Sequence, residues 1–380
     1  MKNVALILSS KSKFSETFIK ELIKGLKNSK RINLKVYYGW ELNKWFGLYL
    51  VFNLLKVLLF PLRIFKNVKF ILDNDPKIKF KESLKITLYD LPVITSFRKF
   101  DFVHFAFSNL AINNTHLSKH FGAKTSLSLR GYDITFFPIN HKDCYKYVWN
   151  NIDQIQYNSN DLLDWAHKWG ASPTIPSSFI SAAVNDEFIL KNENQKEIGK
   201  STEIRILTVG RFHWKKGIDT ALYAIAECIK ENMAVRYTLI GNGPEIEKIK
   251  YLIVALKIEK YVEIKKEISH SEVINFIDQS DLIVVPSVQE GCSNFVLESQ
   301  ARGRYCIVSD AEGMNQVILN EETGKIVKRG DFVALKEAIV DFSKFSIEKR
   351  NEISSIAITR VENEFRRSTQ IEKWINFFNI

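Results

Sequence analysis

Several features that would define a protein class are missing from this sequence. Only four of the 380 residues are cysteine. None of them forms a C-x-x-C pair and no histidine cluster lies near them, so neither a structural zinc site nor a disulfide scaffold is expected. The segment from Met1 to Ser10 lacks the long apolar core and the cleavage site of a secretory signal. We therefore expect reduced cysteines and a cytoplasmic protein.

Glycine and proline are also scarce, at 16 and eight residues, and there is no low-complexity tract. Extended disorder is therefore not expected outside linkers. The composition, with 46% hydrophobic and 26% charged residues, is that of an ordinary folded protein. Because single cores stop growing near about 250–300 residues, a chain of 380 residues is expected to form two domains.

Positive charge is concentrated at the start of the chain. The whole sequence carries 54 basic and 43 acidic residues, a net charge of +11. Residues 1–100 hold 20 basic and 7 acidic residues, or +13, so the remaining 280 residues carry −2. Either this region has an ordinary lysine-rich surface, or it faces anionic lipid headgroups or a diphosphate-bearing acceptor. A nucleic-acid partner is not expected, because no basic helix or aromatic-basic RNA motif accompanies the charge.

An apolar segment, Gly47 to Phe65, lies inside this basic region. It is close to the length of a membrane span, but Asn53, Lys56, Pro61 and Arg63 interrupt it. Placing Lys56 near the middle of a bilayer would cost about 2.5–3.5 kcal/mol. We therefore expect a helix that packs on the core or lies in a membrane interface, rather than one that spans the bilayer.

Strand-like and helix-like segments alternate along the chain, which predicts α/β domains with parallel, doubly wound sheets. The polar stretch 190–202 is interpreted as a linker. It separates an N-terminal Rossmann-like domain, 1–189, from a C-terminal one, 203–360. Residues 361–380 are expected to form a helix that packs back toward the N-terminal domain. In the second domain we expect strands at 204–210, 236–241, 262–264, 281–286 and 305–309, and helices at 217–232, 244–256, 270–279, 294–302, 332–345 and 347–378.

The strongest chemical motif runs from Pro286 to Gly303, where a strand, a loop and a helix follow one another. Ligands of open α/β sheets bind at the carboxyl ends of the strands. The helix is expected to begin near Ser293 or Asn294. The free backbone amides of Ser293, Asn294 and Phe295, together with the helix dipole, would favour a diphosphate there.

Two glutamates, eight residues apart, flank this helix start. Glu290, which precedes Gly291 in the loop, can reach a sugar hydroxyl. Glu298 is expected one turn inside the helix, where it can accept hydrogen bonds from ribose hydroxyls. The alternative is that both are ordinary solvated glutamates, which the strand-loop-helix context disfavours.

A second motif, Val209 to Gly217, places two cations in one loop after a buried strand. Gly210 and Arg211 follow the strand, and Lys216 opens the next helix. The arginine fork and the compact lysine charge can flank a diphosphate. An ordinary basic loop is the alternative.

These motifs together resemble glycosyltransferase family four, the group 1 glycosyltransferases of GT-B architecture. The resemblance is carried by Gly210-Arg211, Lys216-Gly217, the GNG turn at 241–243 and EGCSNFVLE at 290–298, and it covers roughly residues 203–345. It implies two Rossmann-like domains facing across a cleft. It also implies retaining transfer from a UDP- or GDP-sugar without an essential metal.

The resemblance assigns roles to four side chains. Arg211 and Lys216 would hold the donor diphosphate, Glu290 would contact the donor sugar, and Glu298 would bind the ribose. The GNG turn receives no catalytic role.

The N-terminal half matches the family less closely. FSETFI, from Phe14 to Ile19, resembles the Ser-Glu-Thr-Phe-Ile opening of members that build bacterial surface polysaccharides. Ser15 and Thr17 could contact phosphate or sugar, or Ser15 could cap the first helix. His104 resembles a histidine after the family's fourth strand. Like Arg130 and Asp133, it is expected on the acceptor side of the cleft or beside the donor sugar.

In LRGYD, from Leu129 to Asp133, Arg130 stands where many family members have a histidine. A cation at this position can hold an acceptor phosphate or a sugar oxygen, but it cannot act as a general base at neutral pH. A retaining reaction in which the leaving phosphate takes the acceptor proton does not need such a base.

The sequence therefore predicts a retaining glycosyltransferase that uses a nucleotide sugar and a glycan acceptor, expected to be lipid-linked, in surface polysaccharide synthesis. We expect no cofactor and no metal, and peripheral contact of residues 1–100 with the inner face of the plasma membrane. Two alternatives remain. One is a soluble enzyme acting on a small molecule or a protein, and the other is a non-catalytic sugar-nucleotide-binding partner, which Arg130 leaves open.

Overall fold

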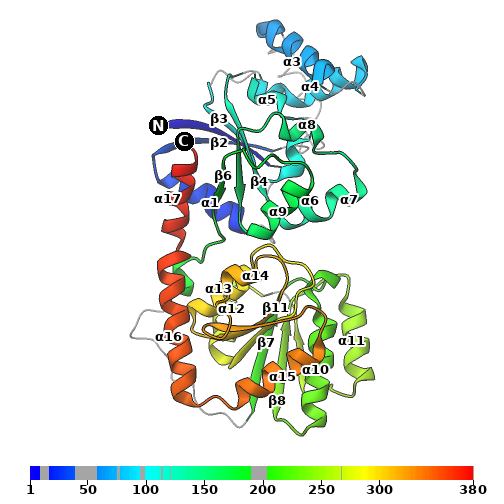
Figure 1. The fold of residues 1–380 in the computed structure, drawn as a ribbon, viewed down its shortest axis with the longest axis vertical. Coiled ribbons are helices and arrows are strands. Elements are labelled where there is room, and N and C mark those ends of the chain that lie inside the picture. Colours follow the sequence, from blue (N-terminus) through cyan, green and yellow to red (C-terminus); the bar gives the residue numbers. More distant parts are fainter. Residues whose placement is uncertain are drawn as a thin grey trace. The chain divides into compact units, whose positions relative to one another are not determined.

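The computed structural model describes residues 1–8, 17–38, 58–74, 78–94, 99–112, 114–119, 121–189, 203–266 and 268–379. The chain divides into two compact units. The N-terminal unit comprises Met1–Ile180 together with Ile371–Ile380, and the C-terminal unit comprises Ser181–Gln370 (Figure 1).

The N-terminal unit is built on a parallel sheet of six strands in the order β2-β1-β3-β4-β5-β6. The strands are β1 (Lys2–Leu8), β2 (Ile32–Tyr38), β3 (Phe102–Phe105), β4 (Lys124–Leu129), β5 (Gln154–Tyr157) and β6 (Ser177–Phe179). The helices are α1 (Thr17–Asn28), α3 (Pro61–Asn74), α4 (Phe80–Ile94), η3 (Ser108–Ala111), α5 (His116–Lys119), α6 (Gly131–Thr135), α7 (Phe137–Asn140), α8 (Lys146–Trp149) and α9 (Asn160–Lys168).

The C-terminal unit repeats this plan with a second parallel sheet, in the order β12-β11-β10-β7-β8-β9. The strands are β7 (Ile204–Val209), β8 (Val235–Ile240), β9 (Val262–Lys265), β10 (Leu282–Val285), β11 (Tyr305–Ser309) and β12 (Gly324–Val327). The helices are η4 (Asp186–Phe188), η6 (Trp214–Lys216), α10 (Ile218–Lys230), α11 (Ile246–Ala255), α12 (His270–Gln279), α13 (Asn294–Ala301), α14 (Met314–Val317), α15 (Phe332–Ser343) and α16 (Ile347–Glu364). Helix α17 (Arg367–Phe377) begins in this unit and ends in the other.

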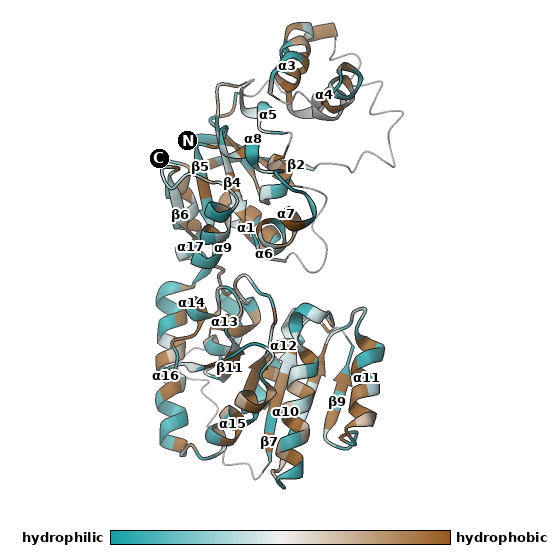
Figure 2. Cartoon of the chain, turned by 45° about the vertical axis from the view of Figure 1, so that its right-hand side comes forward, coloured by the Kyte–Doolittle hydropathy of each residue, from teal (hydrophilic) through white to brown (hydrophobic). Residues whose placement is uncertain are grey.

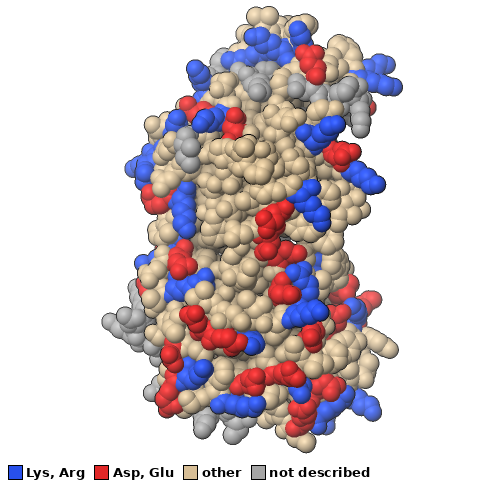
Figure 3. Space-filling model, in the orientation of Figure 1, with Lys and Arg blue, Asp and Glu red and all other residues tan. Residues whose placement is uncertain are grey.

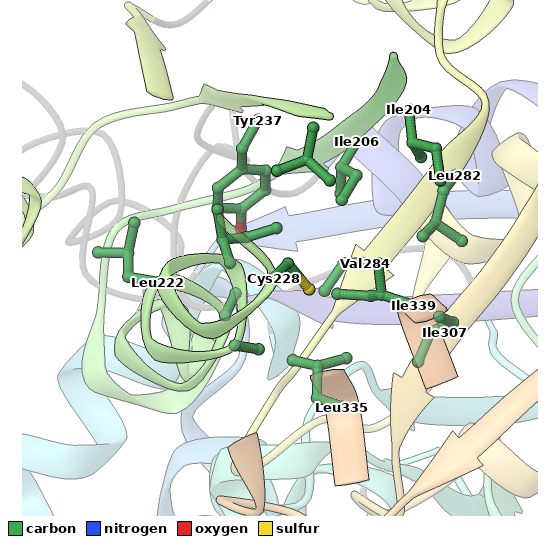
Figure 4. Close-up of a cluster of buried hydrophobic side chains, with 14 of the residues drawn as sticks. Ile204, Ile206, Leu222, Cys228, Tyr237, Leu282, Val284, Ile307, Leu335 and Ile339 are labelled. Carbon is green, nitrogen blue, oxygen red and sulfur yellow. The ribbon is translucent and has the colours of Figure 1, made fainter. Parts of the chain in front are cut away.

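Apolar residues on both faces of the C-terminal strands explain why this sheet is buried between helices. Successive strand residues point to opposite faces. Leu282 and Val284 accordingly join Leu222 of α10 and Leu335 of α15 in one buried cluster (Figure 4). Ile283 faces the other side, in a cluster with residues of α13 and α14. A parallel strand that is covered on both faces has a continuously apolar sequence. The strands of this unit could therefore be predicted from the sequence.

The C-terminal segment completes the core of the N-terminal unit. Trp374 and Phe378 are buried together with Val4 and Leu6 of β1. The Phe378 ring also meets Phe102 of β3 edge-on, with 5.5 Å between ring centroids. The last turns of the chain therefore pack in the N-terminal unit's own hydrophobic core.

Two boundaries differ from those expected. Residues 181–189 belong to the C-terminal unit, because Val184 and Phe188 are buried in its core. The single helix expected at 347–378 is wrong, because the chain breaks between α16 and α17. Phe365 lies at this break, 4% exposed, and its carbonyl accepts a hydrogen bond from the Val184 amide at 2.8 Å.

The four cysteines are free thiols, and burial raises the pKa of Cys144 to about 11 and that of Cys228 to about 12. Within the described ranges, no helix combines the length and the apolar character needed to cross a membrane. The same residues contain no group of three or more His, Cys, Asp or Glu side chains suited to a metal ion. The expected segment 47–57 and the linker 190–202 lie outside the described residues.

Candidate active site

The two motifs of the C-terminal half follow neighbouring strands at the centre of the sheet. β7 and β10 pair directly, Ile206 with Leu282 and Leu207 with Ile283. The strand order reverses at this pair, since β8 and β9 extend to one side and β11 and β12 to the other. Ligands of doubly wound folds bind at such a switch point, outside the carboxyl ends of the strands. The loops after β7 and β10 are therefore the expected binding loops.

Backbone contacts hold the β7 loop in place. Its Phe212 is fully buried, and the Phe212 amide donates to the Asn242 carbonyl at 2.8 Å. A Cβ atom on Gly241 would overlap the Gly210 carbonyl oxygen, and one on Gly243 would overlap the Phe212 carbonyl oxygen. The glycines of the GNG turn thus allow its backbone to approach the β7 loop closely, a role that the sequence pattern did not reveal.

The two binding loops are joined to each other by backbone hydrogen bonds. The Lys215 carbonyl accepts from the amides of Val288 at 2.8 Å and Gln289 at 3.2 Å. Gly217 follows in the left-handed region with φ 58°, and a Cβ atom there would overlap the Pro286 carbonyl oxygen. Backbone contacts alone therefore fix the position of one loop relative to the other.

This register brings Lys216 and Glu290 together as an ion pair between Nζ and Oε2. Their side chains are 30% and 17% exposed, so the pair is partly shielded from water. The lysine stem passes beside half-buried Gly210, whose position leaves room for it. Ser287 Oγ lies 3.4 Å from the same Glu290 oxygen. Two residues chosen from separate motifs 74 positions apart thus meet at one edge of the sheet.

The rest of the β7 loop adds positive charge. Arg211 is exposed, and its side chain takes no part in the Lys216–Glu290 pair. Burial lowers the pKa of Lys215, and the charges of Arg211 and Lys216 add to this effect, while Glu290 opposes it. Burial, then Arg211 and Lys215, likewise lower the pKa of His213. Cations crowded at one strand end favour an anionic ligand.

Helix α13 begins where the sequence predicted. Ser293 is its N-cap, and the Ser293 hydroxyl accepts from the Val296 amide at 3.4 Å. The amides of Asn294 and Phe295, both half-buried, lie in the first turn, where no preceding helical carbonyl is available to them. Glu298 is one turn further on and 9% exposed. Gly291 lies half-buried in the loop between Glu290 and this cap.

Arg329, between β12 and α15, supports the β10 loop and was missed by the sequence analysis. Its guanidinium donates to the Val288 carbonyl at 3.1 Å, to Glu312 Oε1 at 3.2 Å and to Asp310 Oδ1 at 3.1 Å. Val288 lies two residues before Glu290 and also bonds to Lys215. A single arginine in a short polar loop carries no sequence signal for such a contact.

In the N-terminal unit, Asp133 fixes the loop after β4. Its Oδ2 accepts from the Ser108 amide at 2.6 Å and the Ser108 hydroxyl at 2.9 Å, and its Oδ1 accepts from the Arg130 amide at 2.9 Å. Asp133 is 2% exposed, and burial raises its pKa to about 6 against these hydrogen bonds. Its carboxylate therefore serves the loop and does not face a substrate.

Arg130 is half-buried at the carboxyl end of β4, with its guanidinium 5.1 Å from the centroid of the Phe18 ring. Thr17 is the first residue of α1. Ser15 lies outside the described residues. Among the candidate residues of this unit whose side chains the structure describes, Arg130 lies at the end of a strand and is only partly buried, whereas His104 and Asp133 are buried.

His104 does not lie where a substrate could reach it in this unit. It is 1% exposed, and its ring nitrogens hydrogen-bond to Ser126 Oγ at 2.9 Å and Ser128 Oγ at 3.1 Å. The Trp374 ring of α17 packs edge-on against it, with centroids 5.2 Å apart. Burial, reinforced by the charge of Arg130, lowers its pKa to about 3. The acceptor-side role expected for His104 is therefore corrected to that of a neutral core residue.

Two units, each built on a parallel, doubly wound sheet, correspond to the GT-B class of fold. Residues 191–360 match the family model of glycosyl transferases group 1. The whole chain superposes on Anabaena HepE, solved with UDP, at a TM-score of 0.73 and 14% identity, covering 100% of both chains. Sucrose-phosphate synthase of Thermosynechococcus elongatus gives a TM-score of 0.72 at 15% identity, covering 100% of this chain and 98% of the synthase. The fold prediction is confirmed.

Two curated relatives each match less than half of this chain. A protein of Escherichia coli (strain K12) named as a colanic acid biosynthesis glycosyltransferase, WcaL, is 25% identical over 173 residues, 44% of this chain and 43% of the relative. The amylovoran biosynthesis glycosyltransferase AmsK of Erwinia amylovora is 25% identical over 170 residues, 43% of this chain and 42% of the relative. These matches span less than half the length of either relative.

Proposed function

We propose that this chain is a retaining glycosyltransferase that moves a sugar from a nucleoside diphosphate to a glycan acceptor during synthesis of a bacterial-type surface polysaccharide. The observation that carries the proposal is the Lys216–Glu290 pair at the switch point of the C-terminal sheet. The relatives named for colanic acid and amylovoran synthesis, and the fold shared with a protein solved with UDP, agree with it.

The chemistry required is cleavage of the bond between the anomeric carbon and the diphosphate oxygen. Negative charge grows on the leaving diphosphate as this bond breaks. Arg211, Lys216 and the first amides of α13 would offset it, and preorganised donors of this kind are worth roughly 2.7–4 kcal/mol each. Because these groups supply the positive charge, we propose that no metal ion is needed.

Glu290 and Glu298 would orient the two ends of the donor. Lys216 and Ser287 hold the Glu290 carboxylate on one oxygen, which leaves the other available for a sugar hydroxyl. Glu298, one turn into α13, would accept hydrogen bonds from the ribose. With Glu290 engaged as an orienting group, the leaving diphosphate would take the acceptor proton, and the product would keep the donor's anomeric configuration.

The acceptor side is proposed for the N-terminal unit. Arg130, positioned through the Asp133 hydrogen bond to its amide, would hold a phosphate of a lipid-linked acceptor. The excess of 13 positive charges in residues 1–100 supports an anionic acceptor or membrane. We therefore propose that the reaction takes place at the inner face of the plasma membrane.

Removal of the Lys216 charge tests the proposal. Lys216→Ala should lower sugar transfer by about 10²-fold or more, the scale of one preorganised donor. Lys248→Ala is the matched control, because Lys248 lies in the same unit but pairs with Asp219 at 2.9 Å on the surface. Transfer that is unchanged in Lys216→Ala removes the diphosphate assignment. Purified wild-type chain that neither transfers nor hydrolyses any nucleotide sugar would instead indicate a non-catalytic binding partner.

A further inference from the structure

Helices α3 and α4 of the N-terminal unit display large apolar side chains on their outer surfaces. On α3, Leu62 and Phe65 are 75% and 68% exposed. On α4, Phe80 and Leu84 are 63% and 42% exposed. Figure 2 shows hydrophobic and hydrophilic residues side by side on α3. Scattered single apolar residues are ordinary on a surface, but residues grouped on two adjacent helices mark an interaction site.

The two helices pack against each other, although these apolar side chains are exposed. The inner faces of α3 and α4 are joined by a hydrogen bond from Asn67 Nδ2 to Thr87 Oγ1 at 3.1 Å, and both of those residues are buried. Arg63 of α3 also donates to the Ile94 carbonyl at the end of α4, at 3.1 Å. The two helices thus pack against each other through hydrogen-bonded inner faces, while Leu62, Phe65, Phe80 and Leu84 are covered by none of the residues that the structure describes.

Lysines flank the exposed apolar residues at helical spacing. Lys66 and Lys69 follow Leu62 at positions i+4 and i+7, so they continue the same exposed face of α3. Lys79 and Lys81 are exposed on either side of Phe80. Figure 3 shows lysine and arginine atoms gathered over this end of the N-terminal unit. Among the side chains of α3, α4 and residues 78–79 whose burial is described, four lysines are exposed against two acidic residues, Asp73 and Glu82.

We propose that the outer face of the α3–α4 hairpin docks on an anionic lipid surface, with Leu62, Phe65 and Phe80 entering the interface. Apolar side chains bordered by lysines match the interfacial region of a bilayer, where acyl chains lie beneath negatively charged headgroups. The inference rests on the proposed function, because the proposed lipid-linked acceptor is the reason for this chain to bind a membrane. Its test needs no donor and no transfer, so failure of one proposal is distinguishable from failure of the other.

Vesicle sedimentation of the full chain tests the proposal. The chain should sediment with vesicles of phosphatidylcholine mixed with phosphatidylglycerol, and much less with phosphatidylcholine alone. Leu62→Ser combined with Phe65→Ser should lower the partition coefficient at least about tenfold, because two buried apolar side chains are lost. Lys66→Ala combined with Lys69→Ala should weaken binding at low salt and reduce its salt dependence.

A matched control uses Tyr251 and Val254 of α11 in the C-terminal unit, which are 72% and 60% exposed. Lys248 is paired with Asp219 and Glu245, and the other exposed lysines nearby, Lys250 and Lys257, are balanced by exposed Glu247 and Glu259, so this surface has no lysine excess. Tyr251→Ser combined with Val254→Ser should leave vesicle binding unchanged.

Three results would overturn the proposal. The first is that the wild-type chain does not sediment with anionic vesicles, or that the control pair weakens binding as much as the α3 pair. The second is a wild-type dimer that Leu62→Ser/Phe65→Ser converts to a monomer in analytical ultracentrifugation, which would assign the face to a second copy. The third is that Leu62→Ser/Phe65→Ser leaves vesicle binding unchanged but lowers the midpoint of unfolding. This result would mean that another segment of this chain covers the face.

Discussion

Substitution of Gly217 by alanine tests how the two binding loops are held together. Gly217 has φ 58°, and its Cβ position is occupied by the carbonyl oxygen of Pro286 at the end of β10. An L-residue in the left-handed region costs about 1–2 kcal/mol by itself. The overlap can be relieved only if the loops separate, because the obstacle is backbone and not a flexible side chain.

Separation of the loops has a definite cost. The Lys215 carbonyl would lose its hydrogen bonds from Val288 and Gln289. At about 0.5–1.5 kcal/mol for each bond, the total destabilisation of Gly217→Ala becomes roughly 2–5 kcal/mol. Lys216 and Glu290 sit on the two loops that move apart, so donor affinity should fall together with stability.

Gly122→Ala is the matched control. Gly122 also has φ 58°, but nothing lies within 4 Å of its Cβ position, so alanine there should cost only the backbone term. Urea unfolding and titration with the nucleoside diphosphate of the active donor measure the two effects. The reasoning is refuted if both variants lose the same stability and Gly217→Ala binds the nucleotide as tightly as wild type.

Three further outcomes are expected. Arg329→Lys keeps the charge but loses the guanidinium fork that holds the Val288 carbonyl, so the donor KM should rise roughly tenfold with kcat less affected; equal losses in both constants would argue for a different role. EDTA should leave transfer unchanged, and activity that is lost and then restored by magnesium would contradict the proposed metal independence. The pKa of His104 falls from 6.5 unfolded to about 3 folded, so the unfolded chain binds more protons between these values and stability is lost as pH falls below 6.5. From pH 6.5 to 5 this loss amounts to about 2 kcal/mol, and His104→Gln should remove it in urea unfolding; parallel pH profiles for the two proteins would show that the ring is not buried neutral.

The C-terminal unit could be predicted from the sequence because its strands are buried on both faces. Runs such as Leu282–Val285 are continuously apolar, and the loops after them carry the charged residues. Helix α13 begins after Ser293 as expected. The end of the chain was predicted less well. The apolar positions from 347 to 378 fit one helix, and only the burial of Phe365 in the C-terminal core reveals the break.

The N-terminal site residues were harder to predict because polar side chains there serve the fold. His104 and Asp133 stand beside strand ends in sequence, which is also where a ligand-binding residue would stand. Only the three-dimensional contacts separate the cases. The His104 nitrogens are taken by Ser126 and Ser128, and the Asp133 oxygens by Ser108 and the Arg130 amide. Sequence pattern gives the position along a strand, but not which face of the sheet a later helix will cover.

In the C-terminal unit, backbone contacts determine where Lys216 and Glu290 meet. Lys216 and Glu290 are 74 residues apart, yet the positions of both follow from the pairing of β7 with β10 and from the Lys215 carbonyl that joins their loops. Gly217 at the close approach and Arg329 behind the β10 loop act on that geometry without contributing a charge to the pair. If Gly217→Ala and Arg329→Lys weaken donor binding although neither variant replaces Lys216 or Glu290, then the positions of these two side chains are required, and not merely their presence in the sequence.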